Sequence, residues 1–269
     1  MNRPLRIFAV VAAMSSAAGV AASAQSDRAT RFMDDCRHRV NDTAQFCETR
    51  EFTLPLAKSL AVDGRENGGI TVHAWDRSET KVTALIQAHG RTEAEAQNIA
   101  KRIVVSTTGG DVRANSPHGY NGESWSVAYD IWAPRHTDLS LTASNGGVSV
   151  DGMDARMELE TVNGGLRLMD VAGDVRGTTV NGGVTAELSG DRWNGAGLDL
   201  RTSNGGIHLF LPNNYSAQLE TGTVNGGMDI GFPITVQGTF GRRLTTQLGS
   251  GGPRVRAVTT NGGVSIRRR

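Results

Sequence analysis

The chain has 269 residues and a formal net charge of +1, from 28 Lys and Arg against 27 Asp and Glu. This near-neutral balance gives no electrostatic reason to expect binding to nucleic acid. Aromatic residues make up only 5% of the chain and glycine is abundant, at 34 residues, which indicates many short strands and turns rather than a large globular core.

Residues 1–24 have the pattern of a secretory signal peptide. Arg3 and Arg6 precede a short apolar stretch, and Ala22-Ser23-Ala24 fits a small-x-small cleavage site. We therefore expect an exported mature protein that begins at Gln25. No other stretch stays apolar for the roughly 18 residues that a membrane-spanning helix needs, so no membrane span is expected in the mature chain.

Residues 25–137 are expected to form a cap region at the start of the fold. Cys36 and Cys47 are the only two cysteines, and export into an oxidising compartment predicts a disulfide that joins them and closes a small loop. Alternating apolar and polar residues predict strands at 70–74, 81–88 and 125–132.

One helix is predicted, over residues 92–103. Thr92 and Glu95 have the spacing of a capping box, in which each side chain bonds to the other residue's backbone N–H. An apolar stripe that includes Ile99 and Ile103 follows at helical spacing. We expect this helix to pack over the N-terminal end of a sheet and to cover an exposed strand edge.

The tripeptide Asn-Gly-Gly occurs seven times, and residues 138–269 are expected to form a β-strand repeat region built on it, continuous with the cap as one elongated domain. The copies begin at Asn67, Asn145, Asn163, Asn181, Asn204, Asn225 and Asn261. From Asn145 onward the intervals are 18, 18, 23, 21 and 36 residues. The last interval is twice 18, which suggests one degenerate copy within it.

Apolar residues recur at fixed offsets from each Asn. From Asn145 onward, the positions six and four before the Asn and three and five after it are mostly apolar, and the positions between them are mostly polar. This alternation on both sides of a turn predicts two short strands per unit with one buried face. Asn67 lacks the alternation before it, so we expect that copy to belong to a different part of the fold.

The turn residues are expected to serve geometry rather than chemistry. Asn and Gly tolerate the positive φ that tight connections require, and the second Gly allows a close approach of backbone. Stacked Asn side chains can also hydrogen-bond to one another and hold successive units in register.

Two all-β architectures with one helix fit this pattern. The favoured hypothesis is a β-solenoid, a right-handed β-helix-like stack of two-strand coils of about 18 residues, in which equivalent strands pair in parallel. The alternative is an antiparallel β-meander, in which each Asn-Gly is a hairpin tip.

These residues resemble a known family. The exported N-terminus, the cysteine pair, the capped helix and the serial Thr-Val/Ser-Asn-Gly-Gly units are similar to the bacterial β-strand-repeat family of unknown function labelled "putative adhesin". The units close with Gly249-Ser250-Gly251-Gly252 and with Thr259-Thr260-Asn261-Gly262-Gly263. The resemblance covers residues 36–269 and implies a β-solenoid-like protein of the periplasm or cell surface, with no assigned catalysis and no functional residues to transfer.

No catalytic motif stands out in the sequence. The six histidines do not cluster, and no zincin, nucleophile-elbow or P-loop motif occurs. We expect a non-catalytic binding or structural module without a metal or another cofactor. Two alternatives stay open: a polysaccharide-acting enzyme that uses Glu158 and Glu160 on an outward strand face, and an accessory protein of envelope stress or signalling.

Binding candidates lie where the repeat is interrupted. Trp193 with Asn194, and Tyr215, stand on two insertions that lengthen the intervals, where aromatic rings can stack on sugars. The alternative is that these loops only cover an edge. The expected partner is an envelope glycan or a surface protein, and the sequence does not predict the oligomeric state.

Overall fold

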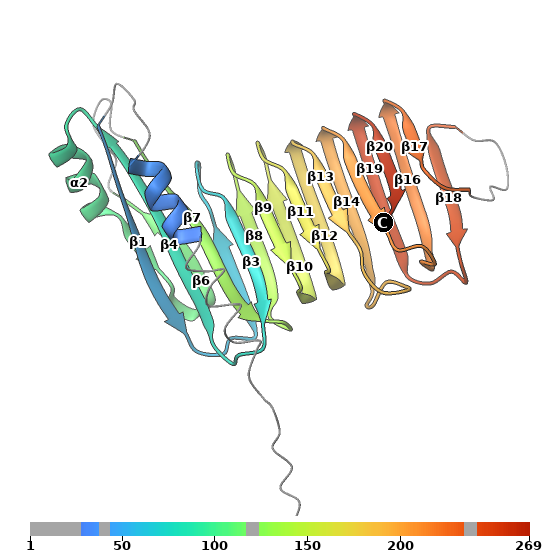
Figure 1. The fold of residues 1–269 in the computed structure, drawn as a ribbon, viewed down its shortest axis with the longest axis horizontal. Helices are drawn as coiled ribbons and strands as arrows, with labels where there is room; N and C mark the ends of the chain where they lie inside the picture. Colours follow the sequence, from blue (N-terminus) through green and yellow to red (C-terminus); the bar gives the residue numbers. More distant parts are fainter. Residues whose placement is uncertain (1–27, 38–43, 117–123, 234–240) are drawn as a thin grey trace, which may run out of the picture.

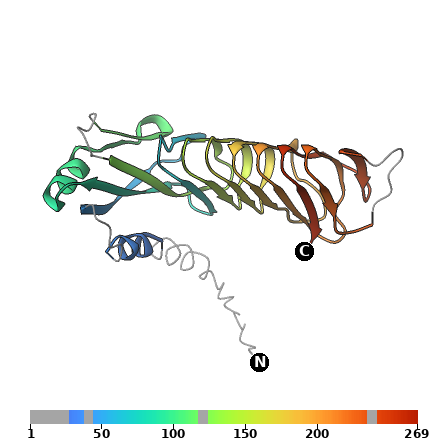
Figure 2. The ribbon, with the colours of Figure 1, turned by 90° about the horizontal axis from the view of Figure 1, so that it is seen from above.

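The computed structural model describes residues 28–37, 44–116, 124–233 and 241–269. These residues form an elongated stack of strands in two layers, each a ten-stranded sheet, with the apolar core between them (Figures 1 and 2). The predicted signal peptide lies outside the described residues.

The first sheet, sheet A, is antiparallel at its N-terminal end and parallel through the repeats. In spatial order its strands are β1 (Ala44–Leu54), β4 (Thr80–Gly90), β7 (Ser124–Pro134), β3 (Ile70–Trp75), β9 (Val148–Asp151), β11 (Leu166–Met169), β13 (Val184–Glu187), β15 (Ile207–Leu211), β20 (Val264–Arg268) and β17 (Met228–Ile230). These include the three strands predicted in the cap region.

The second sheet, sheet B, is parallel except for one antiparallel pair at each edge. In spatial order its strands are β18 (Arg243–Leu248), β16 (Ala217–Asn225), β19 (Arg254–Asn261), β14 (Gly197–Asn204), β12 (Ala172–Asn181), β10 (Asp154–Thr161), β8 (Asp138–Ala143), β2 (Ser59–Asp63), β6 (Asp111–Asn115) and β5 (Val104–Ser106).

Each repeat unit contributes one strand to each sheet, and equivalent strands of stacked units pair in parallel and in register. Met157 lies opposite Leu139 on one side and Val175 on the other, so residues at the same offset from Asn become neighbours. The apolar positions predicted to face inward are buried, apart from Met228 and Ile230 on the edge strand β17, which are half-buried. Parallel partners are what stacked coils require, whereas a meander of Asn-Gly hairpins would place antiparallel partners on either side of each turn.

The Asn side chains form one continuous hydrogen-bonded ladder along the stack. In each step an Asn Nδ2 donates to the Oδ1 of the neighbouring Asn, over 2.8 to 3.2 Å. The spatial order is Asn67, Asn145, Asn163, Asn181, Asn204, Asn261 and Asn225. The hydrogen bonds expected between stacked Asn side chains are therefore present along the whole ladder.

Asn67 is the first rung of this ladder, so the expectation that it belongs elsewhere was wrong. Leu60 and Val62 on β2 are buried and lie opposite Leu139 and Leu141 of the neighbouring coil. Equivalent apolar residues of the other coils face one another in the same way. Leu60 and Val62 stand one residue farther from their Asn because the turn contains an additional residue. Arg65 adopts a left-handed φ of 53° at this place.

Close backbone approach, rather than positive φ, explains the glycines of the turn. Among the Asn and Gly residues of the seven turns, only Gly262 has φ in the left-handed range, so that part of the sequence interpretation was wrong. A Cβ on the first Gly, as at Gly182, would overlap the carbonyl oxygen of Gly164 one coil earlier. That same carbonyl accepts a hydrogen bond of 2.7 Å from the Thr179 hydroxyl, two residues before Asn181.

The last repeat unit is not the last in space. β19 and β20 lie between the coil of β14 and β15 and the coil of β16 and β17. The described part of the long interval between Asn225 and Asn261 contains β18, which pairs antiparallel with β16 and forms the edge of sheet B. The described part of the interval therefore holds an edge strand and a connection back into the stack. The expectation of a degenerate coil there was wrong.

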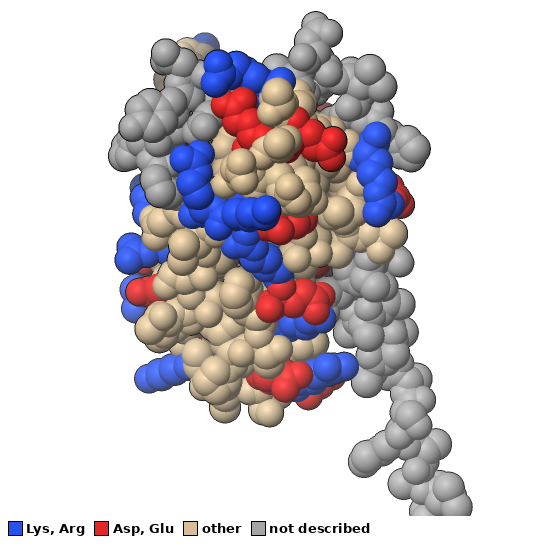
Figure 3. Space-filling view, turned by 90° about the vertical axis from the view of Figure 1, so that its left-hand side faces the viewer, with Lys and Arg blue, Asp and Glu red and all other residues tan. Residues whose placement is uncertain are grey.

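The predicted helix is α2 (Glu93–Arg102), which packs against β1 and β4 at the N-terminal edge of sheet A. The Thr92 hydroxyl accepts a hydrogen bond of 3.2 Å from the Glu95 N–H, as predicted, and Glu95 bonds in return to the N–H of Arg91. At the other end of the helix, the Arg50 side chain of β1 donates to the carbonyl oxygens of Ala100 and Ile103. Figure 3 looks onto this end of the molecule and shows acidic and basic side chains interspersed.

A second helix, over residues 28–37, was missed by the expectation of a single helix. The predicted disulfide is present and joins Cys36 of this helix to Cys47 of β1. A short 3₁₀ helix, η1 (Thr108–Gly110), precedes β6. Neither of the two described α-helices is long and apolar enough to cross a membrane.

Two adjacent glycines provide a test of the backbone contact. In Gly182→Ala, the new methyl group would overlap the neighbouring carbonyl, so we expect a loss of about 3 kcal/mol or more of unfolding free energy. In Gly183→Ala, the Cβ would lie 3.5 Å from the carbonyl oxygen of Gly206, an ordinary contact, so the loss should be much smaller. Thermal unfolding measures both variants, and equal losses would refute the steric explanation.

Candidate functional site

The outer face of sheet B is hollowed along much of its width. Three hollows of about 230, 460 and 500 Å³ follow one another across the strands. Neighbouring hollows share lining residues, since Glu158 lines the first two, and Thr178 and Arg201 line the second and third. Together they make one groove that runs across the strands, which we call the sheet B groove.

Charges of alternating sign cross the floor of this groove. In-register parallel pairing places Glu158, Arg176, Asp199, Arg256 and Glu220 side by side on β10, β12, β14, β19 and β16. Like charges directly opposite each other on neighbouring strands are destabilising. The alternation therefore removes a repulsion that identical repeats would create.

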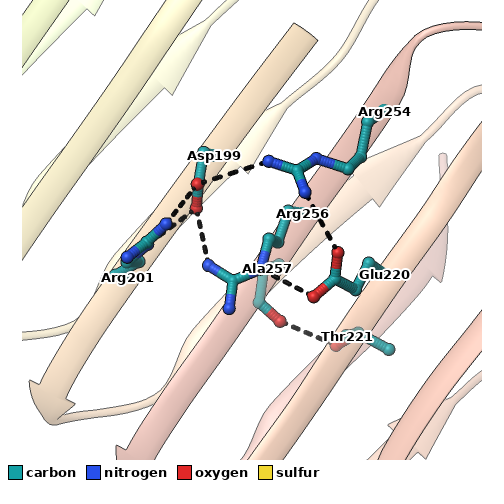
Figure 4. A network of polar contacts seen from close by, with 7 residues as sticks. All are labelled: Asp199, Arg201, Glu220, Thr221, Arg254, Arg256 and Ala257. Atoms are coloured by element: carbon teal, nitrogen blue, oxygen red, sulfur yellow. Dashed lines mark hydrogen bonds and ion pairs between the residues drawn. The ribbon is translucent and has the colours of Figure 1, made fainter.

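Where this row crosses β14, β19 and β16, five side chains form an ion-pair network (Figure 4). Arg201 donates to both carboxylate oxygens of Asp199, over 2.7 and 3.0 Å. Arg256 lies between two carboxylates and donates to Asp199 over 3.0 Å and to Glu220 over 2.7 Å. Arg254 approaches both carboxylates at 3.5 to 3.8 Å. Three guanidinium groups thus meet two carboxylates, which leaves a surplus of one positive charge.

The network stabilises the charged forms of Asp199 and Arg256. Burial alone would raise the pKa of Asp199, but the hydrogen bonds and charges of Arg201 and Arg256 outweigh it and hold this pKa below its usual value. Burial likewise disfavours the charged form of Arg256, and its bonds to Glu220 and Asp199 more than compensate and raise its pKa. Beneath the network, the Thr221 hydroxyl donates to the Ala257 carbonyl over 2.9 Å and ties β16 to β19.

The largest hollow exists because one row of the sheet lacks large side chains. In this row, Val258 and Gly222 separate Arg201 on β14 from Arg243 on β18. Gly222 has no side chain, and Val258 is half-buried. The two residues therefore form a low floor between two arginines.

Hydroxyl groups line the rest of this hollow. They belong to exposed residues on four strands, Thr178, Ser203, Thr260 and Thr245. Within the described part of the chain, Arg243 forms no ion pair. Among the same residues, no group of three or more His, Cys, Asp or Glu is placed to hold a metal ion.

The aromatic binding candidates are not on this surface. Trp193 is 2% exposed, and its indole N–H donates to the Gly173 carbonyl over 3.0 Å. Tyr215 is 5% exposed, and burial raises the pKa of its phenol. Both rings pack into the core where their loops cross from one sheet to the other, and Tyr215 also lines a hollow of about 340 Å³.

Other residues singled out from the sequence lie on the surface. Asn194 is exposed and donates to Asp154 over 3.3 Å. Glu158 and Glu160 project from β10, and both line the middle hollow. Arg243, Val258 and Gly222 were not predicted as site residues. The sequence signal at this place is that apolar Val258 breaks the polar outward pattern of its strand.

Residues 57–267 match the family described as Toastrack DUF4097. The chain belongs to the Toastrack DUF4097 family. The family expected from the Asn-Gly-Gly units and the capped helix is thereby confirmed. No curated protein matches this Toastrack chain.

Several solved structures are similar to this Toastrack chain over most of its length. A putative cell adhesion protein from Clostridium sporogenes is 12% identical, with 83% of this chain and 100% of that chain covered and a TM-score of 0.47. A putative adhesin from Bacteroides fragilis is 14% identical, with coverage of 83% and 97% and a TM-score of 0.39. A putative lipid binding protein from Parabacteroides distasonis is 11% identical, with coverage of 83% and 96% and a TM-score of 0.26.

The pH dependence of stability tests the ion-pair network. Asp199→Asn should lower the unfolding free energy at about pH 7 by about 1–2 kcal/mol, because Arg201 and Arg256 lose a charged acceptor. The folded-state pKa of Asp199 lies below the unfolded value. The stability that it contributes is therefore complete above the unfolded pKa and is lost as the pH falls through the folded pKa.

The stability difference between wild type and Asp199→Asn in thermal unfolding should consequently shrink as the pH is lowered below the unfolded carboxyl pKa of about 3.9. Asp174→Asn on β12 is the matched control, because it removes a carboxylate from the same face that forms no ion pair among the described residues. A difference between wild type and Asp199→Asn that does not change with pH would contradict the assignment.

Proposed function

We propose that this Toastrack protein is an exported, non-catalytic binding module of the bacterial envelope and that the sheet B groove is its binding surface. The observation that carries the proposal is the continuity of the groove: three hollows share lining residues across β2, β6, β8, β10, β12, β14, β19, β16 and β18. A long open groove of this kind suits a chain-like ligand that lies across the strands.

The chemistry of the lining favours a polar polymer over a small apolar molecule. Pockets for small molecules are usually enclosed and mostly apolar. The sheet B groove is instead lined mainly by carboxylates, guanidinium groups and hydroxyls that stand on strands. Such groups hydrogen-bond to a hydroxyl-rich ligand such as an envelope glycan.

The scaffold holds these groups in place before a ligand arrives. The lining side chains stand on strands that are fixed by parallel pairing, by the Asn ladder and by the Thr-to-Gly hydrogen bonds. A preorganised surface loses less conformational entropy on binding. We propose that residues 138–269, together with the coil of β2 and β3, act as a right-handed β-solenoid that presents this surface, and that the remainder of residues 25–137 caps one end of it.

An extracytoplasmic location accords with the disulfide between Cys36 and Cys47, because such bonds persist in oxidising compartments. The proposed leader at residues 1–24 would deliver the chain there. Periplasm and cell surface both satisfy these features.

A second candidate function, glycan cleavage, is favoured by one observation. Glu158 and Glu160 stand two residues apart on one strand face and line the same hollow. Side chains with this spacing start about 7 Å apart, which overlaps the carboxylate separation of glycosidases. Glycan turnover that disappears in both Glu158→Gln and Glu160→Gln would support this alternative to a non-catalytic module.

A bulky substitution tests the binding surface. Thr178→Trp places a large side chain where the middle and largest hollows meet, so binding of the mature protein to fractionated envelope polymers should fall by about tenfold or more. His208→Trp is the matched control, because His208 is exposed at a comparable strand position on the outer face of sheet A. Equal binding by the two variants, or no binding by wild type, would count against the proposal.

A further inference from the structure

We propose that the largest hollow of the sheet B groove binds a carboxylate-bearing glycan, through the guanidinium groups of Arg243 and Arg201. This inference rests on the proposed function, because it names the ligand class for the same groove. It concerns the end of the groove formed by β12, β14, β19, β16 and β18.

The balance of charge in this hollow favours an anionic ligand. Its charged lining residues are Arg201, Arg243 and Arg256 against a single carboxylate, Glu220. Asp199, beside the hollow, engages Arg201 and Arg256. Even when Asp199 is included, the arginines outnumber the carboxylates by three to two, so a ligand that brings a negative charge completes the balance.

Arg243 is the group best placed to meet that charge. It is exposed and, among the described residues, forms no ion pair, whereas Arg256 is held between Asp199 and Glu220. A planar guanidinium group can bind a carboxylate through two parallel hydrogen bonds, which fixes orientation as well as charge. The hydrogen-bonding capacity of Arg243 is therefore available to a ligand, whereas that of Arg256 is used within the ion-pair network.

The floor of the hollow leaves room for a sugar chain between two arginines. Arg201 and Arg243 occupy the same register position on β14 and β18, which are separated by three strand spacings. At the usual spacing of strands, this corresponds to about 14 Å. Only Val258 and Gly222 lie between them in that row. The hydroxyls of Thr178, Ser203, Thr245 and Thr260 surround the floor and can pair with the hydroxyls of sugars.

The remainder of the groove argues against a densely charged polyanion. The hollow at the opposite end is lined by Asp111, Asp138 and Glu158 against Arg156 alone. A nucleic acid or polyphosphate chain running along the groove would meet this acidic end and gain little from counterion release. A glycan with sparse carboxylates can place its charges at Arg243 and Arg201 and present hydroxyls elsewhere.

The experiment compares two ligands with the same sugar backbone, one with free carboxylates and one with uncharged methyl esters in their place. A hyaluronan oligosaccharide, which carries one carboxylate per disaccharide, and its fully methyl-esterified form are titrated into the mature protein by calorimetry. Wild type should bind the acid form at least about tenfold more tightly than the ester, and Arg243→Gln should abolish most of that preference. Arg113→Gln is the matched control, because it removes an exposed arginine of sheet B that lines none of the three hollows.

Each outcome decides the inference. A preference for the acid that disappears in Arg243→Gln and persists in Arg113→Gln supports it. Equal affinity for acid and ester, tighter binding of a polyphosphate chain, or no binding of either form of the oligosaccharide overturns it. If binding to envelope polymers is still lost in Thr178→Trp, those results refute only the ligand class, whereas unchanged binding in Thr178→Trp refutes the groove as well.

Discussion

At the first Gly of each Asn-Gly-Gly, the backbone of one coil lies directly against the backbone of its neighbour. This contact sets the distance between coils, and the side-chain hydrogen bonds between coils depend on that distance. From Gly146 onward no side chain fits there, because a Cβ would overlap the carbonyl oxygen of the first Gly in the neighbouring coil. At that separation an Asn side chain reaches the next Asn outside the turn, and a Thr hydroxyl reaches the same carbonyl from inside it. Thr, Asn and Gly thus each have one role, which is why this short segment recurs while the strand residues vary.

Exact stacking also restricts the charges on the outer faces. Equivalent positions of successive coils become direct neighbours, so a charged residue repeated at one offset would repel its copies. The row from Glu158 to Glu220 avoids this by changing sign at every strand. The adjacent row ends in Arg201, Val258, Gly222 and Arg243, and charges of opposite sign no longer alternate there. The hollow and its surplus of positive charge arise from that interruption.

The sequence was sufficient for the local structure of each coil, because alternation around a turn depends on near neighbours only. It misplaced Asn67 since one additional residue, Arg65, shifts the alternation before that turn without changing which residues pair. Trp193 and Tyr215 looked like exposed loop residues, yet a lengthened loop leaves a gap at the corner of the core that a large ring fills. Loop length alone does not distinguish these outcomes.

The candidate site could not be predicted because it depends on the spatial order of the coils. Offsets from Asn identify which residues are equivalent, but they do not say which coil lies beside which. Only the placement of β19 between β14 and β16 brings Arg256 between Asp199 and Glu220, which come from units that are consecutive in the sequence. In a stack that followed the sequence, these two carboxylates would face each other in register. The exchange of order therefore relieves that repulsion and creates the basic end of the groove.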